Sequence, residues 1–231
     1  MNFFRRCGII FLGDVMNFKS KTAVLFDLDG TVINSKSGIF ASIRYVEQKL
    51  GLPQKSDSEL RYFIGPPILH SFEKYYNMSY EKAVKATEIY REYYADTGVY
   101  MFSVYDGLID TLNSLKIMGK RLYICTCKPE KFAKLIIEKA GIDQLFDGIY
   151  GIELSGHDTT KAQVLNRLLE SEQLSKNDCV LIGDTKFDVI GAKKCAVSSI
   201  GVRYGFASEN ELENECPDAI VNTTAEILSL F

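Results

Sequence analysis

The stretch Ala23-Val24-Leu25-Phe26-Asp27-Leu28-Asp29-Gly30-Thr31 decides the fold of this chain. Its first four residues are apolar and are typical of a buried strand. Because side chains alternate between the faces of a strand, we expect Asp27 and Asp29 to project to the same side. Two carboxylates ~4 Å apart at an effective dielectric of ~20 repel each other by roughly 4 kcal/mol. A divalent cation is the simplest means of offsetting that repulsion.

The end of the same stretch carries groups that suit an anion. Gly30 permits a sharp turn or a close approach to a ligand. Thr31 supplies a hydroxyl, and we expect Gly30 and Thr31 to offer free N–H groups to a phosphate. A plainer interpretation also exists, because Asp-Gly is a common turn and Asp is ordinary at the end of a strand. The rest of the chain must decide between the two.

The composition excludes several classes of protein. Hydrophobic residues make up 46% of the 231 residues and charged residues 25%, as is typical of a globular protein. The formal net charge of −3 argues against a partner that is a nucleic-acid polymer, which usually meets a basic surface. No apolar run approaches the ~20 residues that span a bilayer, so we expect no membrane partner. The six cysteines show no Cys-x-x-Cys pair and no zinc spacing, which favours a reduced, cytoplasmic setting.

Residues 1–20 are expected to form an N-terminal extension. Arg5-Arg6 and the apolar residues after them imitate a signal peptide only weakly, because the apolar part breaks at Asp14 and no small-residue cleavage site follows. Met16 lies just before the first strand and is the expected natural start.

Residues 35–102 are expected to form an inserted bundle of helices. Apolar residues recur at helical spacing from Ile39 to Leu50, from Ile68 to Tyr76 and from Tyr80 to Ala95. No strand pattern lies between Asn34 and Phe102, and a loop of that length inside a compact domain is uncommon. We therefore expect a small helical domain within a larger one.

The remaining residues, 21–34 and 103–231, alternate between strand and helix. Strands are expected at 121–127, 149–154, 179–184, 198–202 and 219–221, with helices between them. Such alternation predicts an α/β fold, a Rossmann-like parallel sheet with helices on both faces.

Ligands bind at the carboxyl ends of the strands in such sheets. Polar residues gather at those ends in four separate clusters, which are Asp27 with Asp29, Thr126 with Lys128, Lys161, and Asp184 with Asp188. Singly, each has a plainer interpretation: Asp188 is a helix-cap residue, Lys161 a solvated lysine, Thr126 a good strand former, and Gly183-Asp184 a turn. Their common edge favours a shared site.

Acidic residues with a lysine at one edge favour a metal-assisted reaction on a phosphate. Oxygen ligands of this kind suit Mg²⁺. We expect Asp27 to attack phosphorus, Asp29 to act as general acid and base, Thr126 to bind a phosphoryl oxygen, and Lys161 to neutralise charge. The helix after Thr126 begins near Pro129 and presents its N–H groups to the same anion.

These residues resemble the haloacid dehalogenase superfamily of phosphohydrolases. The resemblance rests on Asp27-Leu28-Asp29-Gly30-Thr31, Thr126, Lys161 and Gly183-Asp184-Thr185-Lys186-Phe187-Asp188, and spans nearly everything from Lys21 to Phe231. It implies that Asp27 is nucleophile and magnesium ligand, that Asp29 is acid and base and binds the metal through its carbonyl, and that Asp184 and Asp188 complete the metal site. The helical insertion resembles the cap of the phosphoglycolate phosphatase-like branch.

One position departs from the family pattern. Cys127 stands where the family often has Asn or Ser, so we expect its backbone N–H to carry the phosphate contact. A thiol near a phosphate site leads to the hypothesis that activity is sensitive to oxidation.

The leading function is therefore a magnesium-dependent hydrolase of a small phosphorylated metabolite, working through a phospho-aspartate and similar to phosphoglycolate phosphatase. The alternatives are a 5′-nucleotidase of the same family, a β-phosphoglucomutase-like phosphomutase and, from another class, a phospho-accepting signalling receiver. The loop Ile64-Gly65-Pro66-Pro67-Ile68 is expected to help select the substrate, with Arg44, Arg61, His70, Tyr75 and Tyr76 as further candidates. We expect a monomer or a homodimer.

Overall fold

The structure is a computed structural model that describes residues 17–153 and 159–231. The expectations for residues 1–16, including a natural start at Met16, fall outside the described residues.

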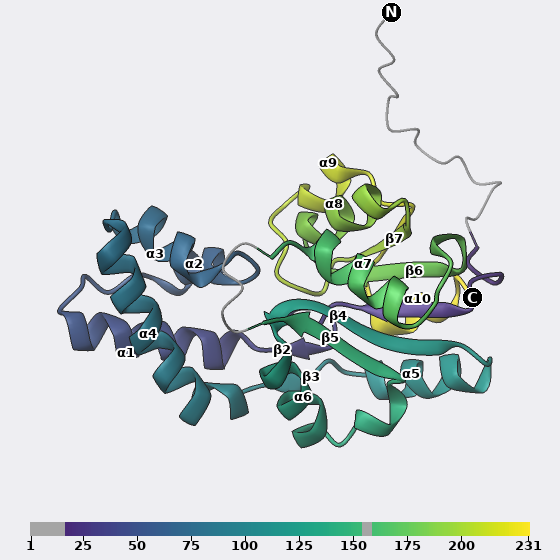
Figure 1. Ribbon diagram of the computed structural model, residues 1–231, viewed down its shortest axis with the longest axis horizontal. Helices are drawn as coiled ribbons and strands as arrows, with labels where there is room; N and C mark the ends of the chain where they lie inside the picture. The colour runs from purple at the N-terminus through teal and green to yellow at the C-terminus, as the bar shows by residue number, and fades with distance from the viewer. Residues whose placement is uncertain (1–16, 154–158) are drawn as a thin grey trace, which may run out of the picture.

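A six-stranded sheet forms the centre of the fold, in the order β5–β4–β1–β6–β7–β8 (Figure 1). Every neighbouring pair in it is parallel. Its strands are β1 (Ala23–Phe26), β4 (Arg121–Pro129), β5 (Gly148–Ile152), β6 (Cys179–Gly183), β7 (Ser198–Val202) and β8 (Ala219–Val221). In the central strand, Leu25 lies opposite Tyr123 on one side and Leu181 on the other. The predicted parallel α/β core is confirmed.

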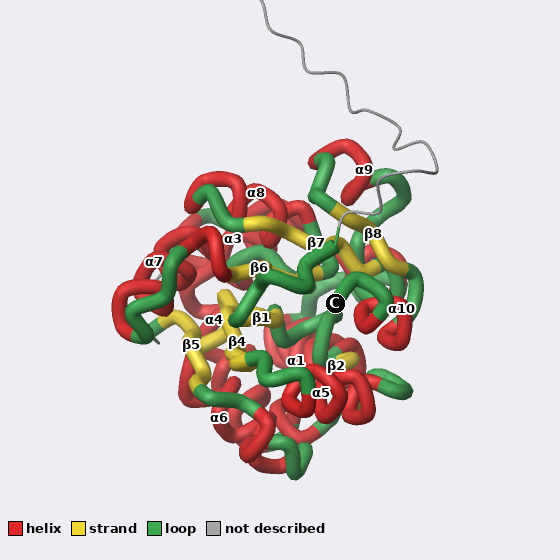
Figure 2. The backbone as a smooth tube through the Cα atoms, turned by 90° about the vertical axis from the view of Figure 1, so that its right-hand side faces the viewer, coloured by secondary structure: helices red, strands yellow, loops and turns green. Residues whose placement is uncertain are grey.

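Helices cover both faces of this sheet (Figure 2). The alternating side chains of β1 explain why, since Val24 and Phe26 belong to one apolar cluster and Ala23 and Leu25 to another. The first cluster is covered by α5 (Leu108–Ile117), α6 (Glu130–Lys139) and α10 (Thr224–Leu228). The second is covered by α7 (Lys161–Ser171) and α8 (Lys186–Cys195), and the short α9 (Glu211–Glu215) lies against α8.

The helical insertion, residues 35–102, leaves the sheet after β1 and returns before α5. Two short antiparallel strands close it, β2 (Ile33–Asn34) and β3 (Ser103–Val104). Its helices are α1 (Lys36–Leu50), α2 (Asp57–Leu60), α3 (Ile68–Tyr76) and α4 (Tyr80–Asp96), with 3₁₀ turns η1 (Arg61–Phe63) and η2 (Gly98–Tyr100). Figure 1 shows these helices beside the sheet rather than on one of its faces. That these boundaries mark a separate domain stays a prediction.

A buried carboxylate organises the helical insertion. Glu47 of α1 is 1% exposed and accepts hydrogen bonds from the hydroxyl of Tyr76 at 2.6 Å and from the main chain of Lys55 at 2.8 Å. Arg44 pairs with the same carboxylate at 2.9 Å. Burying an ionised group is costly unless such partners surround it. Arg44 and Tyr76 therefore have structural roles, although both were candidates for substrate contact.

Element boundaries differ slightly from the predicted ones. Strand β4, predicted to end at residue 127, continues to Pro129, and β5, predicted to continue to residue 154, ends at Ile152. Leu154, the expected end of β5, lies outside the described residues. None of the described helices combines the length and the apolar character needed to cross a membrane.

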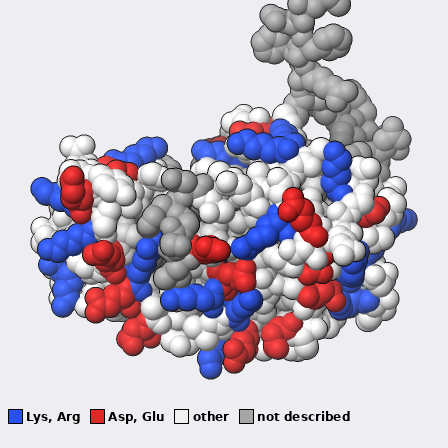
Figure 3. Space-filling model, viewed as in Figure 1, with Lys and Arg blue, Asp and Glu red and all other residues white. Residues whose placement is uncertain are grey.

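Acidic and basic side chains are interspersed on the surface. On the face that Figure 3 presents, groups of Lys and Arg alternate with groups of Asp and Glu over both the helical insertion and the sheet domain. That mixture agrees with the small net charge of the sequence.

Candidate active site

Three aspartates from two neighbouring strand ends bring their carboxylates together. Asp27 follows β1, Asp184 follows β6, and Asp188 lies in the first turn of α8. All three are buried, and a carboxylate oxygen from each lies within 4.8 Å of the others. We call these residues the acidic cluster.

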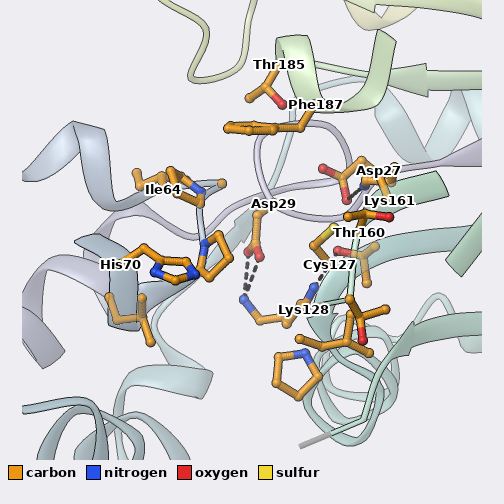
Figure 4. Close-up of a pocket in the computed structure, with 18 of the residues that line it drawn as sticks. Asp27, Asp29, Ile64, His70, Cys127, Lys128, Thr160, Lys161, Thr185 and Phe187 are labelled. Carbon is orange, nitrogen blue, oxygen red and sulfur yellow. Dashed lines mark hydrogen bonds and ion pairs between the residues drawn. The ribbon is translucent and has the colours of Figure 1, made fainter. Parts of the chain in front are cut away.

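Lys161 is the cation that contacts this cluster. Thr160 and Gln163 form a capping box that fixes the start of α7 at Lys161. The Lys161 Nζ lies 2.7 Å from Asp27 Oδ1 and 2.8 Å from Asp188 Oδ1, and it donates to the carbonyl of Cys125 at 2.9 Å (Figure 4). Burial by itself lowers the pKa of Lys161, but Asp188 and Asp27 raise that pKa well above its usual value. The ammonium is therefore charged.

One lysine does not balance three carboxylates. Burial raises the pKa of Asp27 to about 6 even though Lys161 opposes that change. Burial, together with the charges of Asp188 and Asp27, also raises the pKa of Asp184 well above its usual value. A divalent cation removes this penalty, and a set of carboxylate oxygens is the donor set that Mg²⁺ prefers. The residues present thus fit a magnesium ion.

The loop after β7 holds Asp184 in place. The N–H of Phe206 donates to Asp184 Oδ2 at 2.7 Å, and the Thr31 hydroxyl lies 3.5 Å from Oδ1. Gly205 permits this approach, because a Cβ there would lie 2.3 Å from the Cβ of Asp184. The sequence alone did not predict that the loop after β7 contacts Asp184. The only feature of the sequence that could have indicated this contact is Gly205, close to the end of β7.

Asp188 serves both as a helix cap and as a member of the cluster. Its Oδ2 accepts from the N–H and the hydroxyl of Thr185, at 3.1 and 2.9 Å, while its Oδ1 faces Lys161. A Cβ on Gly183 would lie 2.2 Å from the Asp188 carboxyl carbon, so only glycine fits there. The interpretation of Asp188 as a helix cap is therefore compatible with its interpretation as part of a metal site.

The expectation that Gly30 and Thr31 offer free N–H groups is wrong. The N–H of Gly30 donates to Ile33 O at 2.8 Å, and that of Thr31 to Leu28 O at 3.3 Å, because both groups close the turn that follows β1. Gly30 has φ +87°, and a Cβ there would lie 2.0 Å from Asp184 Oδ2. Both residues lie against the carboxylate of Asp184, and neither is among the residues that line the cavity.

Asp29 does not share the partners of Asp27. Its two carboxylate oxygens lie 2.8 and 2.7 Å from the Nζ of Lys128, at the end of β4 (Figure 4). Strand β1 ends at Phe26, so strict alternation no longer applies to the two aspartates. The strand pattern predicted Lys128 at this edge but not its pairing with Asp29.

A cavity of about 480 Å³ lies between these residues and the helical insertion. The polar residues that the sheet edge contributes include Asp27, Asp29, Thr126, Cys127, Lys128, Lys161, Thr185 and Asp188, and further polar lining comes from His70, Arg91, Thr159, Thr160 and Lys194. Its apolar wall includes Phe63, Ile64, Pro66, Pro67, Ile68, Tyr94, Phe132 and Phe187. Thr126 is 2% exposed, and its hydroxyl accepts from the N–H of Lys128 at 3.2 Å.

The other candidates in the helical insertion separate into two groups. The loop 64–68 and His70 line the cavity. Arg61 instead reaches the loop after β7, donating to Phe206 O at 3.2 Å and to Ala207 O at 2.7 Å. Tyr75 stacks on Tyr62 with ring centroids 5.7 Å apart.

Comparisons with known proteins agree with this geometry. Residues 24–202 match the family described as haloacid dehalogenase-like hydrolase. A 5′-nucleotidase from Pseudomonas aeruginosa is 40% identical over 194 residues, which cover 84% of this chain and 88% of that protein. A phosphoglycolate phosphatase from Vibrio parahaemolyticus is 26% identical over 215 residues, covering 90% of this chain and 94% of that protein.

A solved structure extends the comparison to three dimensions. The crystal structure of a predicted phosphatase from Clostridium acetobutylicum superposes with a TM-score of 0.85 at 41% identity, and covers 91% of this chain and 99% of that chain. The residues that match the family, 24–202, contain Lys161 and all three members of the acidic cluster. The chain therefore belongs to the haloacid dehalogenase-like hydrolases and is a phosphatase of that family.

Proposed function

We propose that this phosphatase is a magnesium-dependent phosphomonoester hydrolase that works through a phospho-aspartate on Asp27. The observation that carries the proposal is the arrangement of Asp27, Asp184 and Asp188 around one lysine at the wall of a cavity. Asp27, Asp184 and Asp188 would hold Mg²⁺ by their carboxylates, together with the Asp29 carbonyl. The bound ion would supply charge neutralisation for a phosphoryl group next to these carboxylates.

In the proposed mechanism each residue has a defined role in the two steps of hydrolysis. A carboxylate oxygen of Asp27 attacks phosphorus, and the bond from phosphorus to the ester oxygen breaks. Asp29 gives a proton to the leaving oxygen. Water next attacks the phosphorus of the aspartyl phosphate and loses its proton to Asp29, so that inorganic phosphate leaves and both aspartates return to their first state. Lys161 stabilises charge on Asp27, and the Thr126 hydroxyl and Cys127 N–H bind phosphoryl oxygens.

The helical insertion is proposed to act as a cap that selects the leaving group. It provides most of the apolar wall of the cavity, including Phe63, Ile64 and Tyr94. Closure over the substrate would exclude water from the reacting phosphate.

For the substrate class, the cavity favours a 5′-nucleotide over phosphoglycolate, which was the leading expectation from the sequence. About 480 Å³ with an aromatic wall suits a nucleoside better than a two-carbon acid. The relative named 5′-nucleotidase is also more similar than the one named phosphoglycolate phosphatase.

Release of inorganic phosphate tests the proposal. The panel comprises 5′-AMP, 5′-UMP, 3′-AMP as a positional control, phosphoglycolate and glucose 6-phosphate, each with Mg²⁺ and with EDTA. We expect Mg²⁺-dependent release that is fastest from a 5′-nucleotide. Faster release from phosphoglycolate would reverse the order of the two candidates. Transfer of the phosphoryl group to a sugar without free phosphate would indicate a phosphomutase, and release undiminished by EDTA would contradict the metal requirement. Oligomeric state and a cytoplasmic location stay predictions.

A further inference from the structure

An exposed aromatic ring lines the cavity beside the acidic cluster. Phe187 is the second residue of α8, directly before Asp188, and is 39% exposed. The part of the chain that the structure describes has three other exposed aromatic residues, none of which lines the cavity; these are Tyr62, Tyr80 and Tyr100. One exposed apolar side chain is ordinary on a surface, but Phe187 belongs to a wall that a bound substrate meets.

Other aromatic rings of the cavity wall are already packed. Tyr94 packs edge-on against Phe132 with ring centroids 5.5 Å apart. Phe63 lies with its centroid 5.3 to 5.8 Å from those of three rings of the helical insertion, which belong to Phe72, Tyr75 and Tyr76. Phe187 contacts no aromatic ring among the described residues, and only the Nζ of the exposed Lys186 lies over it, 5.5 Å from the centroid. One side of the Phe187 ring is therefore available to a planar group.

The Phe187 ring lies at the boundary between two cavities. Figure 4 shows the ring edge-on, with one face turned toward the space above Asp29. The loop 64–68 of the helical insertion lies close to the ring, since a Cβ on Gly65 would be 3.8 Å from Phe187 Cδ2. Phe187 and part of that loop also line a second cavity of about 410 Å³. A leaving group that extends beyond a ribose therefore meets this ring.

A planar leaving group gains most from such a ring. Aromatic side chains stack on nucleobases, and they accept any base because every base has a π-face. A sugar or a glycolate has no such face. We propose that Phe187 determines the specificity for nucleotides, because its ring stacks on the base of a bound 5′-nucleotide. The inference rests on the proposed function and names the residue through which the cavity distinguishes a nucleotide from an ester without a base.

Two substrates that differ only by the base isolate this contact. Ribose 5-phosphate carries its phosphate on the same ribose carbon as 5′-AMP but has no base. The measured quantity is the ratio of kcat/KM for 5′-AMP to kcat/KM for ribose 5-phosphate, which reports the contribution of the base to the transition state. The fraction of folded enzyme cancels in this ratio, so a poorly folded variant still gives a valid result.

We expect the wild-type ratio to be well above one and Phe187→Leu to lower it about tenfold, which corresponds to about 1.4 kcal/mol. Leucine keeps an apolar side chain but has no aromatic face. Phe187→Tyr keeps that face and should recover most of the ratio. The matched control is Tyr100→Leu, because Tyr100 is an exposed aromatic residue outside the lining of both cavities, and its ratio should equal that of the wild type.

A wild-type ratio near one, or an unchanged ratio in Phe187→Leu, would overturn the inference and leave the hydrolase proposal intact. A ratio as low in Phe187→Tyr as in Phe187→Leu would also overturn it, because the effect would then not depend on an aromatic face. Wild-type protein that releases phosphate from phosphoglycolate but from no 5′-nucleotide would overturn the inference together with the substrate class. Protein that releases phosphate from no ester of either panel would contradict the proposed function itself.

Discussion

The main-chain N–H of Phe206 donates a hydrogen bond of 2.7 Å to Oδ2 of Asp184. The carbonyl of the same residue accepts from Arg61 of the helical insertion at 3.2 Å. One peptide segment therefore contacts both a member of the acidic cluster and the insertion that covers the cavity. The position of the insertion and the orientation of Asp184 are connected through this segment.

Removal of the Arg61 side chain should weaken that connection. Arg61→Ala loses the hydrogen bonds to Phe206 O and Ala207 O, so the loop after β7 should hold Asp184 less firmly. We expect phosphate release to fall about tenfold, which corresponds to about 1.4 kcal/mol and to the loss of one or two hydrogen bonds from a charged group. Steady-state kinetics measure the change.

The matched control is Arg121→Ala, because Arg121 is an exposed arginine at the opposite end of β4. Its activity should equal that of the wild type. Equal activity in Arg61→Ala would mean that the insertion does not influence Asp184 through Phe206.

Gly30→Ala should damage both stability and activity. The new Cβ would lie 2.0 Å from Asp184 Oδ2, and φ is +87°, where residues other than glycine are strained. We expect a loss of roughly 3 kcal/mol in the free energy of unfolding, measured by urea denaturation, and almost complete loss of Mg²⁺-dependent turnover.

The variant Gly51→Ala serves to separate the effect of backbone strain from the effect of the steric clash between a Cβ at position 30 and Asp184. Gly51 also has positive φ, +63°, but no atom lies within 4 Å of the place that a Cβ would take on this residue. That variant should lose only about 1 kcal/mol and keep full turnover. Similar losses in the two variants would show that the contact with Asp184 is unimportant.

Oxidation of Cys127 should be slow. Burial raises the pKa of Cys127 to about 11, with smaller opposing and supporting effects from Lys161 and Asp27. Because a raised pKa keeps the thiol protonated below about pH 11, the reactive thiolate is scarce at pH 7. We therefore expect turnover to survive peroxide at pH 7, contrary to the hypothesis that the sequence suggests.

Peptide mass mapping after the peroxide treatment provides the control. The exposed Cys216 should be oxidised before Cys127. Rapid inactivation that follows the oxidation of Cys127 would restore the original hypothesis.

The sequence predicted those parts of the site that depend on strand periodicity. The strands Ser198–Val202 and Ala219–Val221 have the expected boundaries, and Asp27, Asp184 and Lys161 meet at the predicted edge. Alternating apolar runs determine where parallel strands end, and the position of a strand end determines where its next side chain lies.

The sequence did not predict contacts that arise only after folding. The Lys128–Asp29 pair and the Phe206–Asp184 hydrogen bond join residues that are far apart in the chain and follow no motif. The error at Gly30 and Thr31 has a local cause, since a tight turn uses its own N–H groups to close itself. The types of residue in a turn do not show which of its N–H groups form hydrogen bonds within the turn itself.

Rapid acid quenching during turnover tests the central claim most directly. The enzyme is mixed with its fastest substrate and Mg²⁺, denatured in acid within milliseconds, digested, and examined by peptide mass spectrometry. We expect one phosphoryl group on the peptide that contains Asp27, and neither that group nor phosphate release in Asp27→Asn. Turnover by the wild type with no phosphorylated Asp27 at any quench time, together with continued turnover by Asp27→Asn, would contradict the account.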